Sequence, residues 1–148
     1  MQSEMTVKMA ESFLDFCYRS DLDGVQAALK SGTDVNIKNE WGQTGLTSAL
    51  MSRQTAVGRF LLEQEGIDIN TFCDHGWTDL HFAAKFADNS ECLAIMLAHP
   101  KLKSHTINKK EWGGDTPIWW AVTHRATRCV QMLISDPRTD LNIKRIRC

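Results

Sequence analysis

The stretch GWTDLHFAA at residues 76–84 decides how this chain folds, because two other segments repeat its pattern. These are GQTGLTSAL at 42–50 and GDTPIWWAV at 114–122, which share Gly-x-Thr-x-[Leu/Ile] and then Ala three positions later. Their threonines at 44, 78 and 116 lie 34 and 38 residues apart, and the asparagines at 36, 70, 108 and 142 lie 34, 38 and 34 apart. Two markers that agree on the period, and on a four-residue excess in the third segment, predict internal repeats.

Each repeat is predicted to contain a turn, a short helix, a tight loop, a longer helix and a second loop. Thr78 stands where an N-cap precedes apolar residues at helical spacing. The second helices carry a one-sided apolar stripe, made of Val57, Leu61, Leu62, Leu93, Met96, Leu97, Val130, Leu133 and Ile134. Small residues at Ala49, Ala83 and Ala121 let neighbouring helices approach closely.

The period, the T-x-L-H pattern and the closing D-x-N resemble ankyrin repeats, whose signature is T-P-L-H-x-A. Thr78-Asp79-Leu80-His81 and Thr116-Pro117-Ile118 match this signature well, and residues 13–36 resemble an N-terminal capping repeat that lacks the hairpin. The resemblance implies an all-α ankyrin-repeat solenoid, in which helix-turn-helix units with short β-hairpin loops stack on one another. We expect a single domain, 1–148, with repeats at about 11–38, 39–72, 73–109 and 110–144.

Some positions depart from the signature. Gly45 and Asp79 replace its proline; Asp79 suits a helix N-terminus, whereas Gly45 should weaken its helix by roughly 0.5–1 kcal/mol relative to alanine. Thr47 and Trp119 replace its histidine, which leaves the histidine's hydrogen bond open in two repeats. The extra residues of the third repeat are expected mainly around 99–106, in the loop after its second helix.

The composition excludes several classes of protein. With 17 basic and 18 acidic residues the net charge is −1, which argues against a nucleic-acid partner. The longest apolar run, 117–122, is far too short to span a membrane. The five cysteines are odd in number and form no C-x-x-C, so we expect reduced thiols in the cytoplasm or the nucleus. Cys17, Cys92 and Cys129 are expected to be buried, and Cys73 and Cys148 to be exposed.

No motif predicts catalysis, a metal or a cofactor. His75 and His81, with Asp74 and Asp79, form the one close cluster, and its spacing fits neither H-x-x-x-H nor a zinc finger. There is no G-x-S-x-G elbow and no Gly-rich phosphate loop. We therefore predict a protein that is not an enzyme, and the basic tail at 144–147 is interpreted as a solvated terminus.

In proteins of the family that this chain resembles, the partner usually touches the hairpin tips and the inner face of the first helices. The matching positions here are Glu40, Trp41, Gln43, Met51, Ser52, Asp74, His75, Trp77, Lys85, Phe86, Trp112, Asp115, Thr123 and His124. Trp41, Trp77 and Trp112 either form an exposed aromatic rail for a partner or lie flat across neighbouring hairpins. Trp119 is interpreted as packing, and Trp120 as either core or surface.

The resemblance therefore implies a non-catalytic protein–protein interaction module that acts as an adaptor or scaffold. The alternative is a stand-alone inhibitor that masks a kinase or a transcription factor, with an enzyme as a more distant alternative. We expect a monomer, or a weak dimer formed through the C-terminal end. Either the fourth repeat caps itself, or the chain is part of a longer protein.

Overall fold

The computed structural model of this chain describes residues 3–142, which fold into helices joined by turns. They fall into two compact units, which divide between Asp68 and Ile69 and are called here the N-terminal and the C-terminal unit. The predicted single domain of 1–148 stays a prediction. The predicted exposure of Cys148, the basic tail at 144–147 and the dimer contact at the end of the chain lie outside the described residues.

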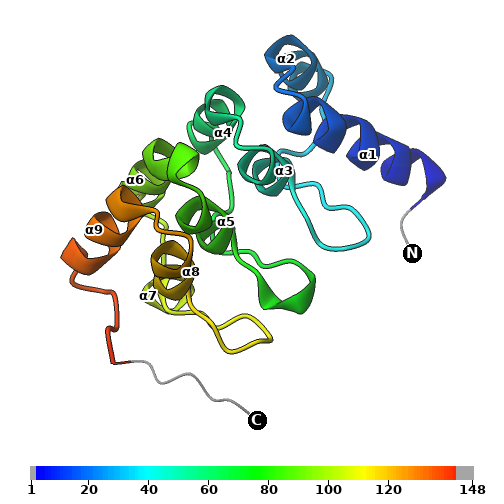
Figure 1. The fold of residues 1–148 in the computed structure, drawn as a ribbon. Helices are drawn as coiled ribbons and strands as arrows, with labels where there is room; N and C mark the ends of the chain where they lie inside the picture. Colours follow the sequence, from blue (N-terminus) through cyan, green and yellow to red (C-terminus); the bar gives the residue numbers. More distant parts are fainter. Residues whose placement is uncertain (1–2, 143–148) are drawn as a thin grey trace. The chain divides into compact units, whose positions relative to one another are not determined.

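The N-terminal unit consists of two helix pairs, which are α1 (Glu4–Tyr18), α2 (Leu22–Lys30), α3 (Gly45–Met51) and α4 (Thr55–Leu62). Helix α1 packs against α2 and α3, and α3 packs against α4 (Figure 1). The side chains between them are almost fully buried and include Phe13, Val25, Leu46, Leu50 and Leu61. Burial of these apolar side chains is the main source of stability for such short helices.

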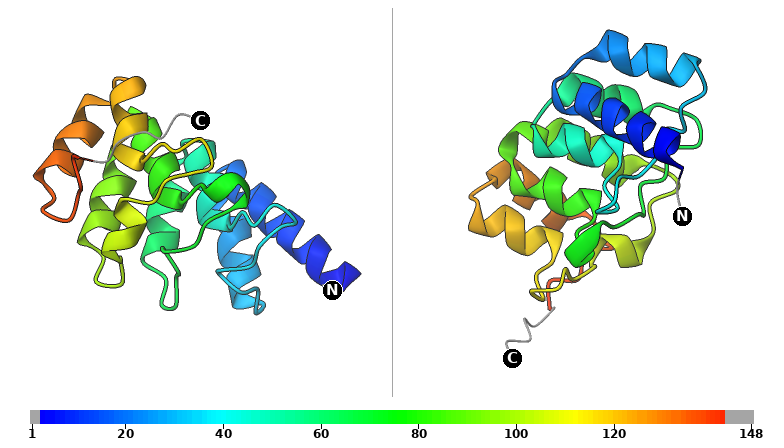
Figure 2. Two further views of the ribbon diagram at one scale, coloured as in Figure 1. Left: turned by 90° about the horizontal axis from the view of Figure 1, so that it is seen from below. Right: turned by 90° about the vertical axis from the view of Figure 1, so that its right-hand side faces the viewer.

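The C-terminal unit also contains two helix pairs, with an additional short helix between them. Its helices are α5 (Asp79–Lys85), α6 (Ser90–Ala98), α7 (Ser104–Ile107), α8 (Pro117–Thr123) and α9 (Thr127–Ser135). Helix α5 lies beside α8, and α6 lies beside α9 (Figure 2). Leu93, Met96 and Leu133 of the predicted stripe are buried, but Ile134 is 53% exposed, so its predicted place in the stripe was wrong. Position 134 lies on the last helix described, where nothing further packs in the part of the chain that the structure shows.

The predicted hairpin loops are present, but they contain very little β-structure. Each is closed by one backbone hydrogen bond, from the N–H of Asn39 to the carbonyl of Gln43 (3.0 Å), from Cys73 to Trp77 (2.8 Å) and from Glu111 to Asp115 (3.0 Å). Between residues 3 and 142, one isolated bridge, Phe72 with Thr78, is the whole β-structure. A glycine with positive φ turns each tip: Gly42, Gly76 and Gly114.

The connection between the two helices of a repeat is the same in the first, second and fourth repeats and differs in the third. Ser20, Arg53 and Arg125 adopt left-handed backbone angles with φ of 60°, 60° and 54°. The third repeat instead leaves α5 through an extended Phe86 and the 3-10 turn Ala87–Asn89, where the Asn89 amide donates to the Phe82 carbonyl at 3.2 Å. This connection absorbs one of the four extra residues, since Met96 follows Thr78 by 18 residues whereas Leu133 follows Thr116 by 17.

The recurring asparagines hold the loops that end the following repeat. The Asn36 amide donates to the Gly66 carbonyl (2.8 Å), and its oxygen accepts from the Asp68 N–H (2.8 Å). Asn70 holds Lys101 and Lys103 in the same way, at 2.7 and 2.9 Å, and its oxygen also accepts from the Thr106 hydroxyl at 2.8 Å. Asn108 holds the Arg138 carbonyl and the Asp140 N–H, both at 2.8 Å. We call these side chains the asparagine clamps.

The clamps also locate the other three extra residues. Gly66 and Arg138 each precede the next repeat's asparagine by four residues, whereas Lys101 precedes Asn108 by seven. The three additional residues therefore follow the clamped position, where the chain forms α7. The predicted placement around 99–106 is confirmed for these three residues.

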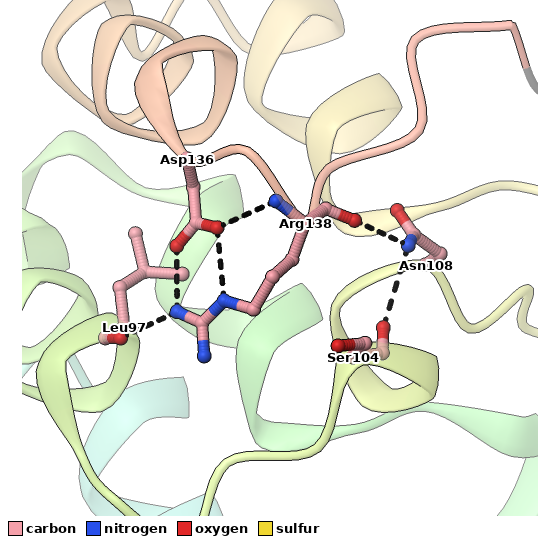
Figure 3. A network of polar contacts seen from close by, with 5 residues as sticks. All are labelled: Leu97, Ser104, Asn108, Asp136 and Arg138. Carbon is pink, nitrogen blue, oxygen red and sulfur yellow. Dashed lines mark hydrogen bonds and ion pairs between the residues drawn. The ribbon is translucent and has the colours of Figure 1, made fainter.

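An ion pair strengthens the last clamp (Figure 3). The Arg138 guanidinium binds the Asp136 carboxylate with two hydrogen bonds of 2.9 and 2.6 Å and also donates to the Leu97 carbonyl at 2.6 Å. The Arg138 carbonyl in turn accepts from the Asn108 amide. Hydrogen bonds from Arg138 lower the pKa of Asp136. A charged group thus joins the end of α9 to the end of α6, which the repeat pattern alone did not predict.

Gly45 allows two helices of the N-terminal unit to approach closely, an effect separate from the expected weakening of its helix, which stays a prediction. A Cβ atom at this position would lie 2.7 Å from the Phe13 ring and 2.9 Å from the Cys17 sulfur. Both side chains are buried on α1, so they have little room to move. The absent side chain lets α1 and α3 pack directly against each other.

We predict that Gly45→Ala lowers the free energy of unfolding by about 1–3 kcal/mol, because overpacking outweighs the gain in helix propensity. Urea denaturation followed by circular dichroism measures it. Ala56→Gly, at an exposed position of α4, is the control for propensity and should cost about 1 kcal/mol. A Gly45→Ala variant that is more stable than the parent contradicts the packing argument.

We also predict that Asn70→Ala lowers the free energy of unfolding by about 1–3 kcal/mol, because three hydrogen bonds are lost. Asn142 is the matched control, since its side chain makes no hydrogen bond to any residue that the structure describes. Asn142→Ala should therefore change stability by less than about 0.5 kcal/mol. Equal effects of the two substitutions in urea denaturation would show that the clamp is not what stabilises the loop.

Candidate functional site

The predicted contact residues of the N-terminal unit surround one rigid tip. The Asn39 side-chain oxygen accepts from the backbone N–H groups of Trp41 (3.1 Å) and Gln43 (2.9 Å), which fixes the turn. Trp41 is 55% exposed, and Glu40 is exposed beside it. Gln43 is half-buried and donates to the sulfur of Met51 at 3.4 Å. A rigid loop that presents an indole to solvent is well suited to bind a partner, because little conformational freedom is lost on binding.

Met51 and Ser52 end α3 on the same unit. Met51 is 39% exposed, whereas Ser52 is half-buried and its hydroxyl donates to the Ala49 carbonyl at 3.1 Å. Ser52 therefore helps to finish the helix, and Met51 offers the more accessible apolar surface of the two.

In the C-terminal unit, predicted residues from two repeats meet around one ammonium group. The Lys85 Nζ lies 4.9 Å from the ring centroid of Trp120, 5.3 Å from that of Phe86 and 5.4 Å from that of Trp77. The rings also contact one another, with Trp77 and Trp120 at 4.7 Å and Trp120 and His124 at 5.3 Å. We call this group the Lys85 cluster, which consists of Trp77, Phe82, Lys85, Phe86, Trp120 and His124.

Helical spacing explains the cluster. Phe82 and Lys85 are three residues apart on α5, and Trp120 and His124 are four positions apart at the end of α8, so each pair lies on one face. Trp77 precedes α5 and packs on Phe82 at 4.9 Å. A cation over several aromatic faces is held electrostatically and partly desolvated. Among residues 3–142, no carboxylate forms an ion pair with Lys85, so its ammonium remains available to an acidic group of a partner.

A second, smaller contact joins the tips of the third and fourth repeats. The Trp112 N–H donates to the His75 carbonyl at 2.7 Å, and the two rings lie 4.8 Å apart. His75 takes a left-handed conformation, φ 67°, to present that carbonyl. Trp112 is nevertheless 77% exposed, and Asp74 and His75 are exposed as well. This tip therefore presents an indole, an imidazole and a carboxylate to solvent.

His81 fixes the tip of the fourth repeat to α5. Its Nδ1 accepts from the Thr78 N–H at 3.0 Å, so the proton is on Nε2, which donates to the Asp115 carbonyl at 3.1 Å. Burial lowers the pKa of His81 to about 4, so the ring is neutral at pH 7. In α3, Thr47 replaces the histidine and still accepts from the Thr44 N–H at 3.1 Å. The question that the sequence left open is thus answered in part for Thr47, which keeps the cap.

Of the predicted contact residues, Asp115 is the one that the structure buries. Asp115 is buried, with 4% exposed, because its carbonyl binds His81 and its N–H donates to Glu111 at 3.1 Å. The predicted exposure of Cys73 was wrong, since its thiol is turned inward and donates to the Asp74 carbonyl at 3.6 Å. Trp77 is half-buried in the Lys85 cluster and thus follows the packing alternative, whereas Trp41 and Trp112 are exposed.

Two residues of the Lys85 cluster, Phe82 and Trp120, were not among the predicted contact residues. Phe82 and Trp120 occupy the same repeat position, four residues after Thr78 and Thr116. An aromatic residue at that position in two successive repeats was the signal for a shared surface. Trp119 is half-buried and meets Trp120 edge-on at 5.1 Å, as the packing interpretation requires. Thr123 and His124 are exposed at the end of α8.

The thiols are poorly placed for chemistry. Burial raises the pKa of Cys17 to about 12 and also raises the pKa of Cys129. Cys17, Cys73, Cys92 and Cys129 are all free and buried. Thiols with a raised pKa are protonated at pH 7 and therefore weak nucleophiles. Over residues 3–142, no three His, Cys, Asp or Glu side chains are grouped to hold a metal ion.

None of the helices within residues 3–142 has the length and apolar character that crossing a bilayer requires.

Comparison with known proteins gives two matches to family models and two informative relatives. A model described as ankyrin repeats (3 copies) matches residues 14–108, and one described as ankyrin repeat matches residues 113–146. The chain is 36% identical over 83 residues to the RelA-associated inhibitor of Mus musculus, and 32% identical over 101 residues to the nuclear factor NF-kappa-B p105 subunit of Gallus gallus. These alignments cover 56% and 68% of this chain but only 10% of each relative.

We predict that His81 makes stability fall as the pH drops from about 6.5 to about 4. The unfolded imidazole takes up a proton near pH 6.5, whereas the buried ring resists protonation until about pH 4, so acid favours unfolding. The full effect is about 3 kcal/mol, and it is absent above pH 6.5. Urea denaturation at successive pH values measures it.

His81→Thr should have a flatter pH profile between these values, because threonine caps the helix without titrating, as Thr47 does in α3. His105→Thr, at an exposed position, is the control and should keep the parent slope. Parallel profiles of the parent and His81→Thr would refute the assignment to His81.

Proposed function

The chain belongs to the ankyrin-repeat family, which confirms the predicted all-α ankyrin-repeat solenoid, and we propose that it is a non-catalytic protein-interaction module. In this proposal a partner protein binds exposed tip and first-helix side chains, and the module acts as an adaptor or scaffold. The relatives support a role in protein binding, since one is named for its association with RelA.

The Lys85 cluster is the observation that carries this proposal. Side chains from two successive repeats hold one ammonium over three aromatic rings, without an ion pair among the described residues. Aromatic residues contribute strongly to binding when a partner excludes water from them. The chemistry of the cluster fits a carboxylate beside an apolar group, so an acidic side chain of the partner is the proposed contact for Lys85.

A role as an inhibitor is the second candidate. It is favoured by the relative named RelA-associated inhibitor, which makes RelA the first partner to try. A measurement of the partner's own activity separates the two candidates. An inhibitor lowers that activity when it saturates the partner, whereas an adaptor leaves it unchanged. The cytoplasm or the nucleus is the proposed location, supported by the free thiols at positions 17, 73, 92 and 129.

We predict that Trp112→Ala and Lys85→Gln each weaken partner binding by about 2 kcal/mol, or about thirtyfold, because they remove an exposed anchor and the cation of the cluster. The measurement is affinity capture from native lysate with quantitative mass spectrometry, followed by calorimetric titration with the purified partner. Purified RelA is titrated directly in the same way.

Ile134→Ala is the matched control, because Ile134 is an exposed apolar residue on α9, outside the tips and first helices. Circular dichroism establishes that every variant is folded. A partner that is lost equally from all three variants argues against the cluster as the site, and a partner retained by all three places the contact elsewhere on the chain.

A further inference from the structure

The N-terminal unit contains a groove that is distinct from the Lys85 cluster. It has a volume of about 310 Å³ and lies between α1 and the tip of the second repeat. Its lining residues are Val7, Ala10, Glu11, Leu14, Asn39, Glu40 and Trp41. The α1 residues follow one another at i, i+3, i+4 and i+7, so they form a single helix face.

The groove has an apolar floor and one wall that stands on a hydrogen-bonded loop. Ala10 and Leu14 are buried beneath it, with 1% and 6% exposed. Trp41 forms the wall, and the two hydrogen bonds accepted by Asn39 hold the loop that carries it. Val7 is 39% and Trp41 is 55% exposed, so apolar surface faces solvent on both sides. A groove of this shape accommodates one large aliphatic side chain.

The rim of the groove is acidic. Glu11 and Glu40 both line it, and neither forms an ion pair with another residue that the structure describes. Glu4, two turns earlier on α1, already forms an ion pair with Lys8 at 3.3 Å. Two exposed carboxylates beside apolar surface favour a cationic partner over an anionic one.

The backbone N–H of Glu40 offers a hydrogen-bond donor beside the groove. Glu40 stands four residues before Thr44, as Trp112 stands four residues before Thr116. The Trp112 N–H donates to the carbonyl of the preceding tip at His75, at 2.7 Å. The Glu40 N–H donates to no residue within 3–142. An extended peptide can supply the missing carbonyl, as in recognition by strand addition.

We propose that this groove binds a short extended segment of a partner protein that carries one large aliphatic side chain between basic residues. The aliphatic group lies against Leu14 and Trp41, the basic side chains pair with Glu11 and Glu40, and a backbone carbonyl accepts from the Glu40 N–H. This site extends the proposed function to a second surface and specifies the chemistry of its ligand, without depending on the Lys85 cluster.

The test uses the full chain and the fluorescein-labelled peptide Gly-Lys-Arg-Leu-Arg-Lys-Gly in a fluorescence anisotropy titration. The expected result is saturable binding that weakens at least about tenfold when serine replaces the leucine of the peptide, because the apolar contact is lost. Equal binding of the serine peptide overturns the proposal, since it reduces the interaction to general charge attraction. Absence of binding by the leucine peptide overturns it as well.

The protein variants separate the site from the net charge. Glu11→Gln/Glu40→Gln should weaken binding at least about tenfold, whereas Glu63→Gln/Glu65→Gln, exposed at the end of α4, removes the same charge elsewhere and should have little effect. Equal losses in both pairs overturn the assignment. Lys85→Gln should bind the peptide with the same affinity as the parent. The peptide titration therefore tests the groove alone, and the partner titration tests the Lys85 cluster.

Discussion

The asparagine clamps are the interaction on which the loops of this protein depend. A loop that leaves the end of a helix pair has backbone groups without a regular partner, and these need hydrogen bonds wherever water is excluded. One carboxamide supplies both a donor and an acceptor, so it can hold a carbonyl and an N–H two residues apart. Asn36, Asn70 and Asn108 each do so for the loop that ends the following repeat.

This constraint explains which insertions the repeats accept. The clamp fixes the loop at Gly66, Lys101 and Arg138, and residues added after that position do not disturb it. The third repeat carries three extra residues there, which form α7, and the Thr106 hydroxyl of that helix donates to the same Asn70 oxygen. The insertion is therefore tied back to the clamp rather than left as a free loop. In the fourth repeat, Arg138 supplies the clamped carbonyl and also binds Asp136, which adds a charged contact to the same junction.

The sequence predicted the helices because the determinants of a helix are local. Thr44 and Thr78 cap their helices as the spacing indicated, and the stripe residues Leu61, Met96 and Leu133 are buried. Contacts between helices could not be predicted from such local patterns. Helix propensity identifies Gly45 as unfavourable, and only the position of the Phe13 ring, 2.7 Å from the missing Cβ, reveals why glycine is required.

For the candidate site too, the sequence predicted local features but not the contacts between repeats. The repeat register placed Trp41, Trp112 and His75 at tips, where the structure has them exposed. The register did not indicate that Asp115 is held inward through His81, since that bond joins two repeats and depends on which residue follows Thr78 by three. The Lys85 cluster escaped prediction as a unit for a similar reason. Its rings come from Trp77 before α5, Phe86 after α5 and Trp120 on α8, and no single repeat contains the set.

The net charge of this chain does not describe the local charge of its proposed binding surfaces. The value of −1 is the sum of 17 basic and 18 acidic residues, and it argues only against a strongly basic binding surface. In the proposed binding, recognition depends instead on charges that lie beside apolar surface and form no ion pair within residues 3–142. Lys85 is such a cation, surrounded by aromatic rings, and Glu11 and Glu40 are such anions, beside Leu14 and Trp41. Because the aromatic groups displace water around each charge, a partner charge of opposite sign interacts more strongly there than at an ordinary solvated surface. Two surfaces of opposite preference can therefore exist on one nearly neutral chain, and each selects its ligand by sign as well as by shape.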